Sequence, residues 1–465
     1  MGTVFDPFRW ACVSAEVQGA RHTTPQALAQ KQQQRLAHLL NSARKGSRFY
    51  SKRLAHLPVD GGLESLAAIA PVDRDTLMAG FDDWVCDPAL SLSAVRAWLA
   101  DPDHIGQPYL GRYLVWESSG TSGSPGIFVQ DAQAMAVYDA LESLRRPANP
   151  TPWRLWDPLY LSERIAFVGA TDGHFASYVT VERMRELQPW MAASIRPFSI
   201  LQPLDDLFDA LQAFAPTVLA TYPTAASLLA EAVLAGRLQL PLRELWTGGE
   251  TLSHAARRRI ESALGCTVRN SYGASEFLAM GWECPHGHMH LNTDWLLLEP
   301  VDERLRPVPA GHASHAVLLT NLANTVQPLI RYTMGDQITL QDTPCPCGSP
   351  LPWAQVLGRC DHILRVRGAQ PGSTVPLLPL ALSTVLEDDA GVFDFQIRQT
   401  DDHTLVLRLP DQGAVGRQVL QRARKVLKAH AAQQGAVALR VVGELGLEIP
   451  RGRSGKACRI QAMRP

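Results

Sequence analysis

The chain has 465 residues, of which 46% are hydrophobic and 19% are charged, and its formal net charge is −1. This composition is typical of a folded globular protein, and the length exceeds what one hydrophobic core supports, so we expect two or more domains. The near-neutral charge excludes a general electrostatic attraction to nucleic acid or to an anionic membrane surface.

The N-terminal segment has neither a secretory signal nor a myristoylation pattern. "MGTVFDPFRWACVSAEV" lacks a basic stretch followed by an apolar one, and Asp6 stands where the myristoylation pattern requires serine or threonine. No apolar run in the chain reaches the roughly 18 residues that a membrane span needs. We therefore expect a cytoplasmic protein that contacts no membrane. Its eight cysteines should not form a disulfide framework, and clustered ones indicate a metal or catalytic site.

The first predicted helix starts near residue 25. Thr24 is a suitable N-cap and Pro25 suits the first helical turn. Four apolar residues then share one face of the helix, which we expect to be buried: Leu36, Leu39, Leu40 and Ala43.

From about residue 115 to 300, short apolar runs alternate with helical stretches. The apolar runs "IAFVGA", "TVLATY" and "RELWTGG" flank helical sequence such as "TAASLLAEAVLAG". This alternation predicts an α/β architecture with a largely buried sheet.

After residue 360 the pattern changes to that of a small α+β unit. "FDFQIRQ", "HTLVLRLP" and "VALRVVGEL" are typical of strands, and "GAQPGSTVP" has the composition of a loop. Residues 414–430 form a predicted helix with one apolar stripe, made of Val415, Val419, Ala423 and Val426. We place the domain boundary within 357–368, which gives domains of 1–359 and 360–465.

Five short motifs occur in a fixed order along the chain. They are "SSGTSGSPG" (118–126), "NSYGASE" (270–276), "RYTMGD" (331–336), "GRCDHILRVRG" (358–368) and "RGRSGKACR" (451–459). Each alone could be a turn or an exposed tail. In this order they resemble the core motifs of the adenylate-forming superfamily of acyl-CoA synthetases and adenylation domains. The segments 33–54, 71–81, 290–302 and 327–336 are similar to the phenylacetate–CoA ligase branch.

The resemblance implies a large N-terminal α/β adenylation domain of several subdomains, followed by a small mobile α+β C-terminal domain. It also implies an ATP- and Mg²⁺-dependent ligase. The carboxylate of an acid attacks the α-phosphate of ATP, which gives an acyl-adenylate and pyrophosphate, and a thiol then displaces AMP. The branch implies an aromatic acid of the phenylacetate or hydroxybenzoate type and coenzyme A as the thiol.

Two alternatives to this function stay open: transfer to the phosphopantetheine of an acyl carrier protein, and a non-catalytic zinc-containing member that only binds its ligands. Nucleic-acid binding is disfavoured because no basic stretch interleaved with aromatic residues occurs. A monomer or a homodimer is expected.

Roles follow residue by residue from the motifs. Lys456 corresponds to the catalytic lysine, Glu276 to the magnesium-associated carboxylate and Asp336 to the carboxylate that binds the ribose hydroxyls. Tyr272 would lie against the adenine, and Arg359 at the ribose–phosphate edge. The implied ATP-binding set is Ser118, Ser119, Gly120, Thr121, Ser122, Gly123, Gly248, Gly249, Glu250, Ser271, Tyr272, Gly273, Asp336 and Arg359.

One position of the phosphate loop departs from the family pattern. Many relatives have lysine where this chain has Ser124. The loss of that cation places more weight on backbone N–H groups and on Mg²⁺ for holding the phosphates.

The same resemblance implies where the acid and the thiol would lie. An aromatic-rimmed acyl pocket would be lined by Tyr222, Trp246, Tyr272, Gly273 and Ala274. Trp246 fits the buried core equally well. Asp361 corresponds to the hinge between the domains, and Gly368 to the position where the thiol arm enters.

Four residues in two distant segments could bind zinc. Cys284 and His290 lie in "ECPHGHMHLN", and Cys345 and Cys347 lie in "CPCGSP". Two cysteines close in sequence and a distant Cys/His pair make a four-ligand set, which is typical of structural zinc, although this spacing alone leaves the presence of a metal open. His286 and His288 are competing nitrogen ligands. The resemblance favours His290 and a structural zinc.

Overall fold

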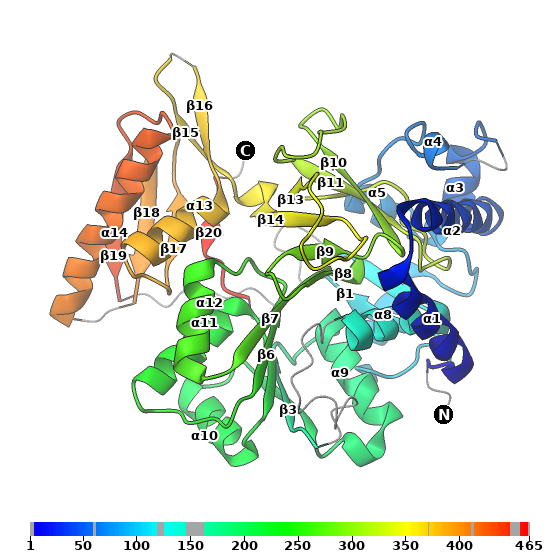
Figure 1. The fold of residues 1–465 in the computed structure, drawn as a ribbon, viewed down its shortest axis with the longest axis horizontal. Helices are drawn as coiled ribbons and strands as arrows, with labels where there is room; N and C mark the ends of the chain where they lie inside the picture. Colours follow the sequence, from blue (N-terminus) through cyan, green and yellow to red (C-terminus); the bar gives the residue numbers. More distant parts are fainter. Residues whose placement is uncertain are drawn as a thin grey trace.

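The structure is a computed structural model that describes residues 4–58, 62–118, 125–145, 162–370, 372–410, 413–446 and 456–463. Figure 1 shows the N-terminal helices in blue on one side, a large sheet in the middle and the C-terminal elements in orange and red on the other side. The predicted α/β class is confirmed.

A nine-stranded mixed sheet organises the chain, with the strand order β13-β14-β9-β8-β7-β6-β5-β3-β4. The five strands from β4 to β7 pair in parallel, and the strands from β7 to β13 pair antiparallel. The bounds are β3 Ile165–Gly169, β4 Ile195–Ser199, β5 Val218–Thr221, β6 Glu244–Gly248, β7 Thr267–Ala274, β8 Phe277–Glu283, β9 Met289–Leu291, β13 Asp336–Leu340 and β14 Trp353–Arg359. The carboxyl ends of β5, β6 and β7 therefore meet at one edge, where ligands of open α/β sheets bind.

The helices that precede β1 in the chain contribute many of the buried residues of the largest apolar core. The predicted helix is α2, Pro25–Gly46; Thr24 caps it by accepting the Ala27 N–H at 3.2 Å, and all four stripe residues are buried. The remaining elements are α1 Pro7–Gly19, η1 Ala20–His22, α3 Arg48–Arg53, α4 Leu63–Leu66, α5 Arg74–Ala79, α6 Phe81–Trp84, α7 Leu92–Leu99 and η2 Pro102–His104.

A hairpin, a long helix and a small sheet pack against these helices in the same core. The hairpin consists of β1 Leu114–Glu117 and β2 Ile127–Gln130, and α8 is Ala132–Arg145. The small antiparallel sheet consists of β10 Leu296–Val301, β11 Ala316–Asn321 and β12 Tyr332–Met334.

A second apolar core lies between the parallel strands and the helices that connect them. Leu207, Leu229, Leu245 and Ile260 are buried there and come from α10, α11, β6 and α12. The connecting elements are α9 Ala176–Leu187, η4 Pro189–Met191, α10 Leu204–Phe214, α11 Pro223–Leu234 and α12 His254–Leu264.

The C-terminal elements enclose a third core around a four-stranded sheet of order β19-β18-β17-β20. The elements are η5 Cys360–His362, β15 Leu364–Arg367, β16 Thr374–Leu377, α13 Pro379–Thr384, the π-helix η6 Val385–Asp389, β17 Gln396–Gln399, β18 Thr404–Leu409, α14 Gly413–Gln433, β19 Arg440–Leu445 and β20 Ile460–Gln461. All described buried members of this core follow residue 363. The domain boundary at 359/360 stays a prediction.

Two details of the C-terminal prediction are corrected. Val415 is 61% exposed, because the buried stripe of α14 runs through Leu420, Ala423, Leu427 and Ala431 instead. The segment expected as a loop after Gly368 contains β16, which pairs with β15 as a hairpin.

None of the helices in the described part of the chain combines the length and the apolar character that crossing a membrane would require.

Candidate active site and metal centre

The turn after β6 brings one predicted carboxylate to the edge of the sheet. Gly249 has a φ of +75°, which a glycine adopts without strain, and a Cβ at this position would meet the Lys456 Nζ at 2.9 Å. Glu250 accepts hydrogen bonds from the N–H and the hydroxyl of Thr224 at 3.0 and 3.1 Å, and from the Ala457 N–H at 3.2 Å. Glu250 therefore joins the start of α11 to the segment that carries Lys456.

Tyr272, near the end of β7, is buried and hydrogen-bonded to another predicted residue. Its hydroxyl donates to Asp336 Oδ2 at 2.7 Å, and burial together with that carboxylate raises the pKa of Tyr272 well above its ordinary value. Gly273 follows, and a Cβ there would lie 1.9 Å from the carbonyl oxygen of Leu278. The close approach of β7 and β8 thus itself requires glycine at this position.

Glu276 lies in the turn between β7 and β8. Its Oε1 accepts the hydroxyl hydrogen of Tyr332 at 3.0 Å, and burial raises the pKa of the Glu276 carboxyl. A buried carboxylate with charged neighbours is a reasonable ligand for a hard cation such as Mg²⁺.

Asp336 and Arg359 face each other across a strand pair. They are register partners at the start of β13 and the end of β14, and the Arg359 Nη1 lies 3.4 Å from Asp336 Oδ1. Asp336 is 9% exposed, whereas the Arg359 side chain is 44% exposed. The exposed guanidinium can therefore reach a ligand beside the less accessible carboxylate.

Lys456 extends from the C-terminal unit into this group of carboxylates. Its Nζ lies 5.5 Å from the centre of the Tyr222 ring. Loss of hydration lowers the pKa of Lys456, and the charges of Glu250, Asp336 and Glu276 act in the opposite direction. The structure therefore brings together Lys456, Glu250, Glu276, Asp336 and Arg359 from distant parts of the sequence.

The phosphate loop is described only at its ends. Ser119, Gly120, Thr121, Ser122 and Gly123 lie outside the described residues, as does Ser124. The Ser118 N–H donates to the Gly126 carbonyl and the Gly126 N–H donates to the Ser118 hydroxyl, both at 2.8 Å. These two bonds close the base of the loop between β1 and β2.

One arginine near this loop was not predicted. A Cβ at Gly126 would lie 3.4 Å from Arg74 Cδ. Burial raises the pKa of Tyr332, which donates to Glu276, and the charge of Arg74 offsets part of that rise. Arg74 is the first residue of α5. The sequence signal was its place in "PVDRDTLMAGF" (71–81), which supported only the family resemblance.

The predicted acyl-pocket residues pack against different apolar cores. Tyr222 is buried in the second core with Leu245, whereas Trp246 packs against Ile165, Met191, Ile195 and Val218 and donates to Glu244 at 3.0 Å. Trp246 thus fits its alternative role as a core residue. Ala274 packs against the first core. A small cavity lies beside the end of β7, lined by Leu141, Glu142, Asn270, Ser271, Ala279, Gly281, Trp282 and Asn292.

The residues predicted for domain motion lie on the chain that enters the C-terminal unit. The backbone of Asp361 is in η5, and its side chain lies outside the described residues. The Gly368 N–H donates to the Ser373 carbonyl at 2.9 Å, and a Cβ at Gly368 would lie 2.5 Å from the Ser373 hydroxyl. Packing inside the β15–β16 hairpin is therefore a further reason for glycine at 368.

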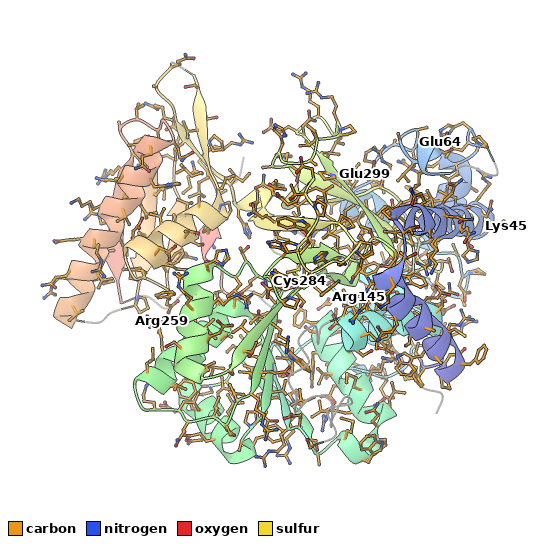
Figure 2. All side chains as sticks on the ribbon, in the orientation of Figure 1. Lys45, Glu64, Arg145, Arg259, Cys284 and Glu299 are labelled. Carbon is orange, nitrogen blue, oxygen red and sulfur yellow. The ribbon has the colours of Figure 1, made fainter. Side chains whose placement is uncertain are left out.

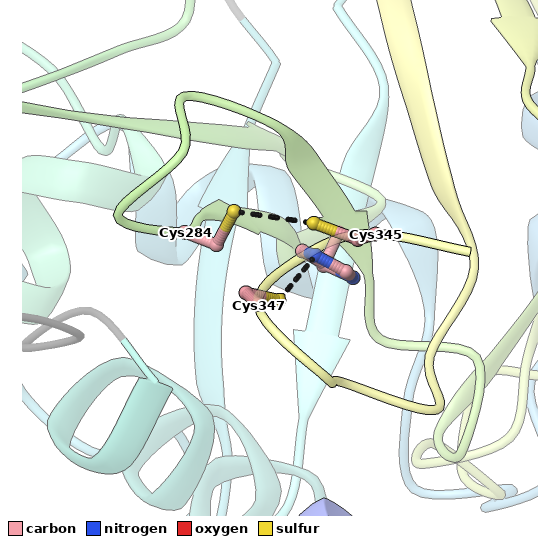
Figure 3. A group of neighbouring side chains, drawn as sticks. Cys284, Cys345 and Cys347 are labelled. Carbon is pink, nitrogen blue, oxygen red and sulfur yellow. Dashed lines mark hydrogen bonds between the residues drawn. The ribbon is translucent and has the colours of Figure 1, made fainter. Parts of the chain in front are cut away.

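The four predicted zinc ligands converge. Cys284 lies near the centre of the molecule (Figure 2), and Figure 3 shows it facing Cys345 and Cys347. One ligand atom from each of Cys284, His290, Cys345 and Cys347 can be chosen so that all lie within 4.8 Å of one another. The sulfurs of Cys284 and Cys345 are 3.7 Å apart. A tetrahedral zinc with Zn–S bonds of about 2.3 Å requires two sulfurs to lie roughly 3.8 Å apart, so the spacing fits this metal.

The orientation of His290 suits a ligand. This side chain is fully buried, its Nδ1 lies 2.8 Å from the Leu351 carbonyl oxygen, and its Nε2 lies 3.2 Å from Cys347 Sγ. A carbonyl oxygen can only accept a hydrogen bond, so Nδ1 carries the hydrogen and donates it, and the Nε2 lone pair faces the cysteines. His288 instead stacks on Trp353 and approaches Cys345 at 3.2 Å through Nδ1. His290 therefore fits the fourth position, with His288 adjacent to the cluster.

Comparison with known proteins gives curated relatives that match part of the chain. No model of a known protein family matches the chain. Phenylacetate–coenzyme A ligase of Thermus thermophilus is 32% identical over 167 residues, which are 34% of this chain and 37% of that protein. The chain spans about a third of the length of the curated relatives it matches.

Solved structures extend the comparison over the whole chain. 2-Hydroxyisobutyryl-CoA ligase in the postadenylation state has a TM-score of 0.68 at 20% identity, with 96% of this chain and 91% of that chain covered. The same ligase in complex with 2-HIB-AMP and CoA has a TM-score of 0.56 at 20% identity, with 95% and 91% covered. Benzoate CoA ligase from Burkholderia xenovorans has a TM-score of 0.50 at 15% identity, with 74% and 67% covered. The resemblance predicted from the sequence is thus confirmed: the chain is similar to phenylacetate–coenzyme A ligase and has the fold of the adenylate-forming CoA ligases.

Proposed function

We propose that this protein is an AMP-forming acid–thiol ligase. The observation that carries the proposal is the position of Lys456, which comes from the C-terminal unit, lies beside Gly249 and is close enough to the carboxylates of Glu250, Glu276 and Asp336 for their charges to act on it. An ammonium group at this position neutralises charge where an anionic acid approaches an anionic phosphate. Bringing the two anions together in one orientation supplies much of the remaining acceleration.

The nucleotide would be held by residues of the N-terminal part. The Asp336 carboxylate is a suitable acceptor for two ribose hydroxyls, and Arg359 lies beside it for the ribose–phosphate edge. Tyr272 would lie against the adenine, next to the backbone of Gly248, Gly249 and Ser271. Glu276 would hold Mg²⁺, which when bound neutralises phosphate charge.

Arg74 would supply the cation that the phosphate loop lacks at position 124. This side chain borders Gly126, at the end of the loop, and is 23% exposed. Its guanidinium could form hydrogen bonds with phosphate oxygens that an ammonium group would otherwise contact.

The second half-reaction would require the C-terminal unit to move. Attack by a thiol on the acyl-adenylate releases AMP and has no need of Lys456 at the phosphate. We therefore propose Asp361 as the hinge and Gly368 as a residue of the thiol path, as the resemblance implies.

Coenzyme A is the proposed thiol, and an aromatic carboxylic acid of the phenylacetate or hydroxybenzoate type is the proposed substrate. The names of phenylacetate–coenzyme A ligase and benzoate CoA ligase support an aromatic acid, and the complex of 2-hydroxyisobutyryl-CoA ligase with CoA supports the acceptor. The two basic residues near Gly368 are already engaged, since Arg365 pairs with Glu303 and Arg367 with Asp402. An acyl carrier protein therefore remains the alternative acceptor. A cytoplasmic location follows from the proposed use of ATP and CoA.

We also propose a structural zinc bound by Cys284, His290, Cys345 and Cys347. Four protein ligands leave no open position for a substrate, which is typical of a structural site. The zinc would fix the turn between β8 and β9 to the segment between β13 and β14.

One assay tests the activity together with its acceptor. Pyrophosphate release is measured with ATP, Mg²⁺ and a panel of aryl and aliphatic acids, each with and without CoA. Release with an aryl acid that rises when CoA is added, together with the acyl-CoA in mass spectra, is the expected result. Release that CoA does not stimulate would favour a carrier protein, and no release with any acid while ATP still binds would favour the non-catalytic alternative.

A further inference from the structure

A second buried carboxylate lies away from the nucleotide residues, where the C-terminal unit meets α12. Glu387 is the central residue of the π-helix η6 and is 3% exposed. Short π-helical segments are rare and occur frequently at functional sites. Charged side chains are almost never this buried unless they are paired.

The two carboxylate oxygens of Glu387 accept hydrogen bonds from different parts of the molecule. Its Oε1 accepts a hydrogen bond from the Arg459 guanidinium at 2.5 Å, within the C-terminal unit. Its Oε2 accepts the hydroxyl hydrogen of Ser253, which is the N-cap of α12 in the N-terminal part. The same Ser253 oxygen accepts the Ala256 N–H at 3.0 Å. The Ser253 hydroxyl thus donates to Glu387 of the C-terminal unit and at the same time caps α12.

Arg459 connects this contact to the proposed catalytic lysine. It follows Lys456 by three residues, its guanidinium also donates to the Phe393 carbonyl at 3.0 Å, and it lies 4.1 Å from the centre of the Phe395 ring. The Arg459 carbonyl accepts the Ile397 N–H at 2.7 Å. These contacts fix the start of β20 and limit where the chain can direct Lys456.

Two further contacts join α12 itself to the C-terminal unit, and both are more exposed or uncharged on one side. Arg258 and Asp388 are 3.4 Å apart, but their side chains are 70% and 39% exposed, and such pairs contribute little. Arg259, a residue of α12 on the side toward the C-terminal unit in Figure 2, covers the Phe393 ring at 4.4 Å. Among the described contacts of α12 with the C-terminal unit, the Ser253–Glu387 bond has a buried charged acceptor, and losing a partner of such a group is costly.

We propose that Glu387 is a positioning residue for the first half-reaction, which holds the C-terminal unit on α12 through Ser253 and directs Lys456 through Arg459. This inference rests on the proposed function. Movement of the C-terminal unit must break the Ser253–Glu387 bond, whereas the Glu387–Arg459 pair moves with the unit. Loss of the bond therefore slows only the step that needs Lys456 at the phosphate.

Four variants test this role. S253A removes the contact between the two parts and leaves the Glu387–Arg459 pair. S253T keeps a hydroxyl that caps the helix and reaches Glu387. E444Q is the matched control, because Glu444 pairs with Arg408 at 2.6 Å inside the C-terminal unit and lies away from α12. E387Q is a fourth variant, which weakens both bonds at once.

The first readout needs no activity. Hydrogen–deuterium exchange is followed in peptides that cover residues 456–463, in the protein without substrate. We expect S253A and E387Q to exchange about tenfold faster than the wild type in these peptides, the change that follows from about 1.4 kcal/mol of lost docking, and S253T and E444Q to match the wild type. Unchanged exchange in S253A and E387Q would overturn the proposal.

The second readout separates the half-reactions. ATP–pyrophosphate exchange with phenylacetate should fall about tenfold in S253A, whereas transfer from synthetic phenylacetyl-adenylate to CoA should be unchanged or faster. S253T should restore the first rate. Equal loss of both rates would overturn the positioning role. If the wild type shows no exchange with any acid, the proposed function fails, and hydrogen exchange still decides whether Glu387 holds the two parts together.

Discussion

The cysteine–histidine cluster and the nucleotide site are built in opposite ways. The four ligand atoms of the cluster come from turns and short strands of one sheet, and all four lie within 4.8 Å of one another. The proposed nucleotide site takes Lys456 from one unit and Glu250, Glu276 and Asp336 from another. A site whose residues all belong to one sheet can stabilise the fold. A site divided between two units can form and separate in each turnover.

The comparison predicts that damage to the two sites has different effects. Changes at the divided site should alter rates and leave the free energy of unfolding nearly constant. Changes at the cluster should alter stability first.

Lys456→Ala should have the largest effect on rate. Removal of one preorganised charge costs roughly 100- to 1000-fold in the step that needs it, so ATP–pyrophosphate exchange should nearly vanish while the melting temperature stays unchanged. Transfer from synthetic acyl-adenylate to CoA should persist. A folded variant with normal exchange would contradict the assignment of the lysine.

Cys345→Ser should have the largest effect on stability. A metal present at a hundredfold excess over its Kd stabilises the folded state by about 2.7 kcal/mol, and we expect most of this to be lost with one ligand. Metal content by mass spectrometry and urea unfolding measure the two effects. Cys12→Ser is the control, because Cys12 is exposed and distant in sequence from the cluster. Wild-type protein that is fully folded without zinc would refute the metal centre.

Asp336→Ala should weaken ATP binding without removing activity. Hydrogen bonds to a charged acceptor contribute about 1.5–3 kcal/mol, so calorimetry should give an affinity lower by about 10- to 100-fold. Asp302→Asn provides a control, since Asp302 pairs with the exposed Arg306. Equal affinity in the Asp336 variant would contradict the ribose role.

The pH dependence should show the smallest effect. Loss of hydration lowers the pKa of Lys456 below 10.5. The protonated form is the active one, so kcat/KM for ATP should fall as the pH rises through this lowered pKa, earlier than an ordinary lysine would cause. Arginine stays protonated, so in Lys456→Arg any remaining activity should lose this alkaline limb. If the fall of kcat/KM at high pH is unchanged in Lys456→Arg, a group other than Lys456 causes it.

Much of this organisation could be predicted from the sequence, because it depends on local patterns. Thr24 and Pro25 marked the start of α2, and the alternating apolar residues marked β17 and β18. The cysteine–histidine cluster, too, was predicted: the residue types indicated a four-ligand set, and the family resemblance favoured His290, the histidine that faces Cys347.

What the sequence did not predict depends on contacts between distant residues. Trp246 could line a pocket or a core from its sequence, and its packing against Ile165, Ile195 and Val218 arises only when the strands of the sheet come together. Val415 was placed on the apolar stripe of α14, but the buried face passes through Leu420, Ala423 and Leu427 and leaves Val415 exposed. Glu387 and Arg74 carry no motif of their own. Their proposed roles depend on the segments that lie beside them in the folded chain.

Direct detection of the intermediate tests the central claim. The protein is mixed in stoichiometric amount with ATP, Mg²⁺ and phenylacetate in the absence of CoA, quenched, and analysed by mass spectrometry. An AMP-forming ligase should yield phenylacetyl-adenylate and pyrophosphate, in about equal amounts. Formation of ADP and phosphate instead would contradict the proposed chemistry.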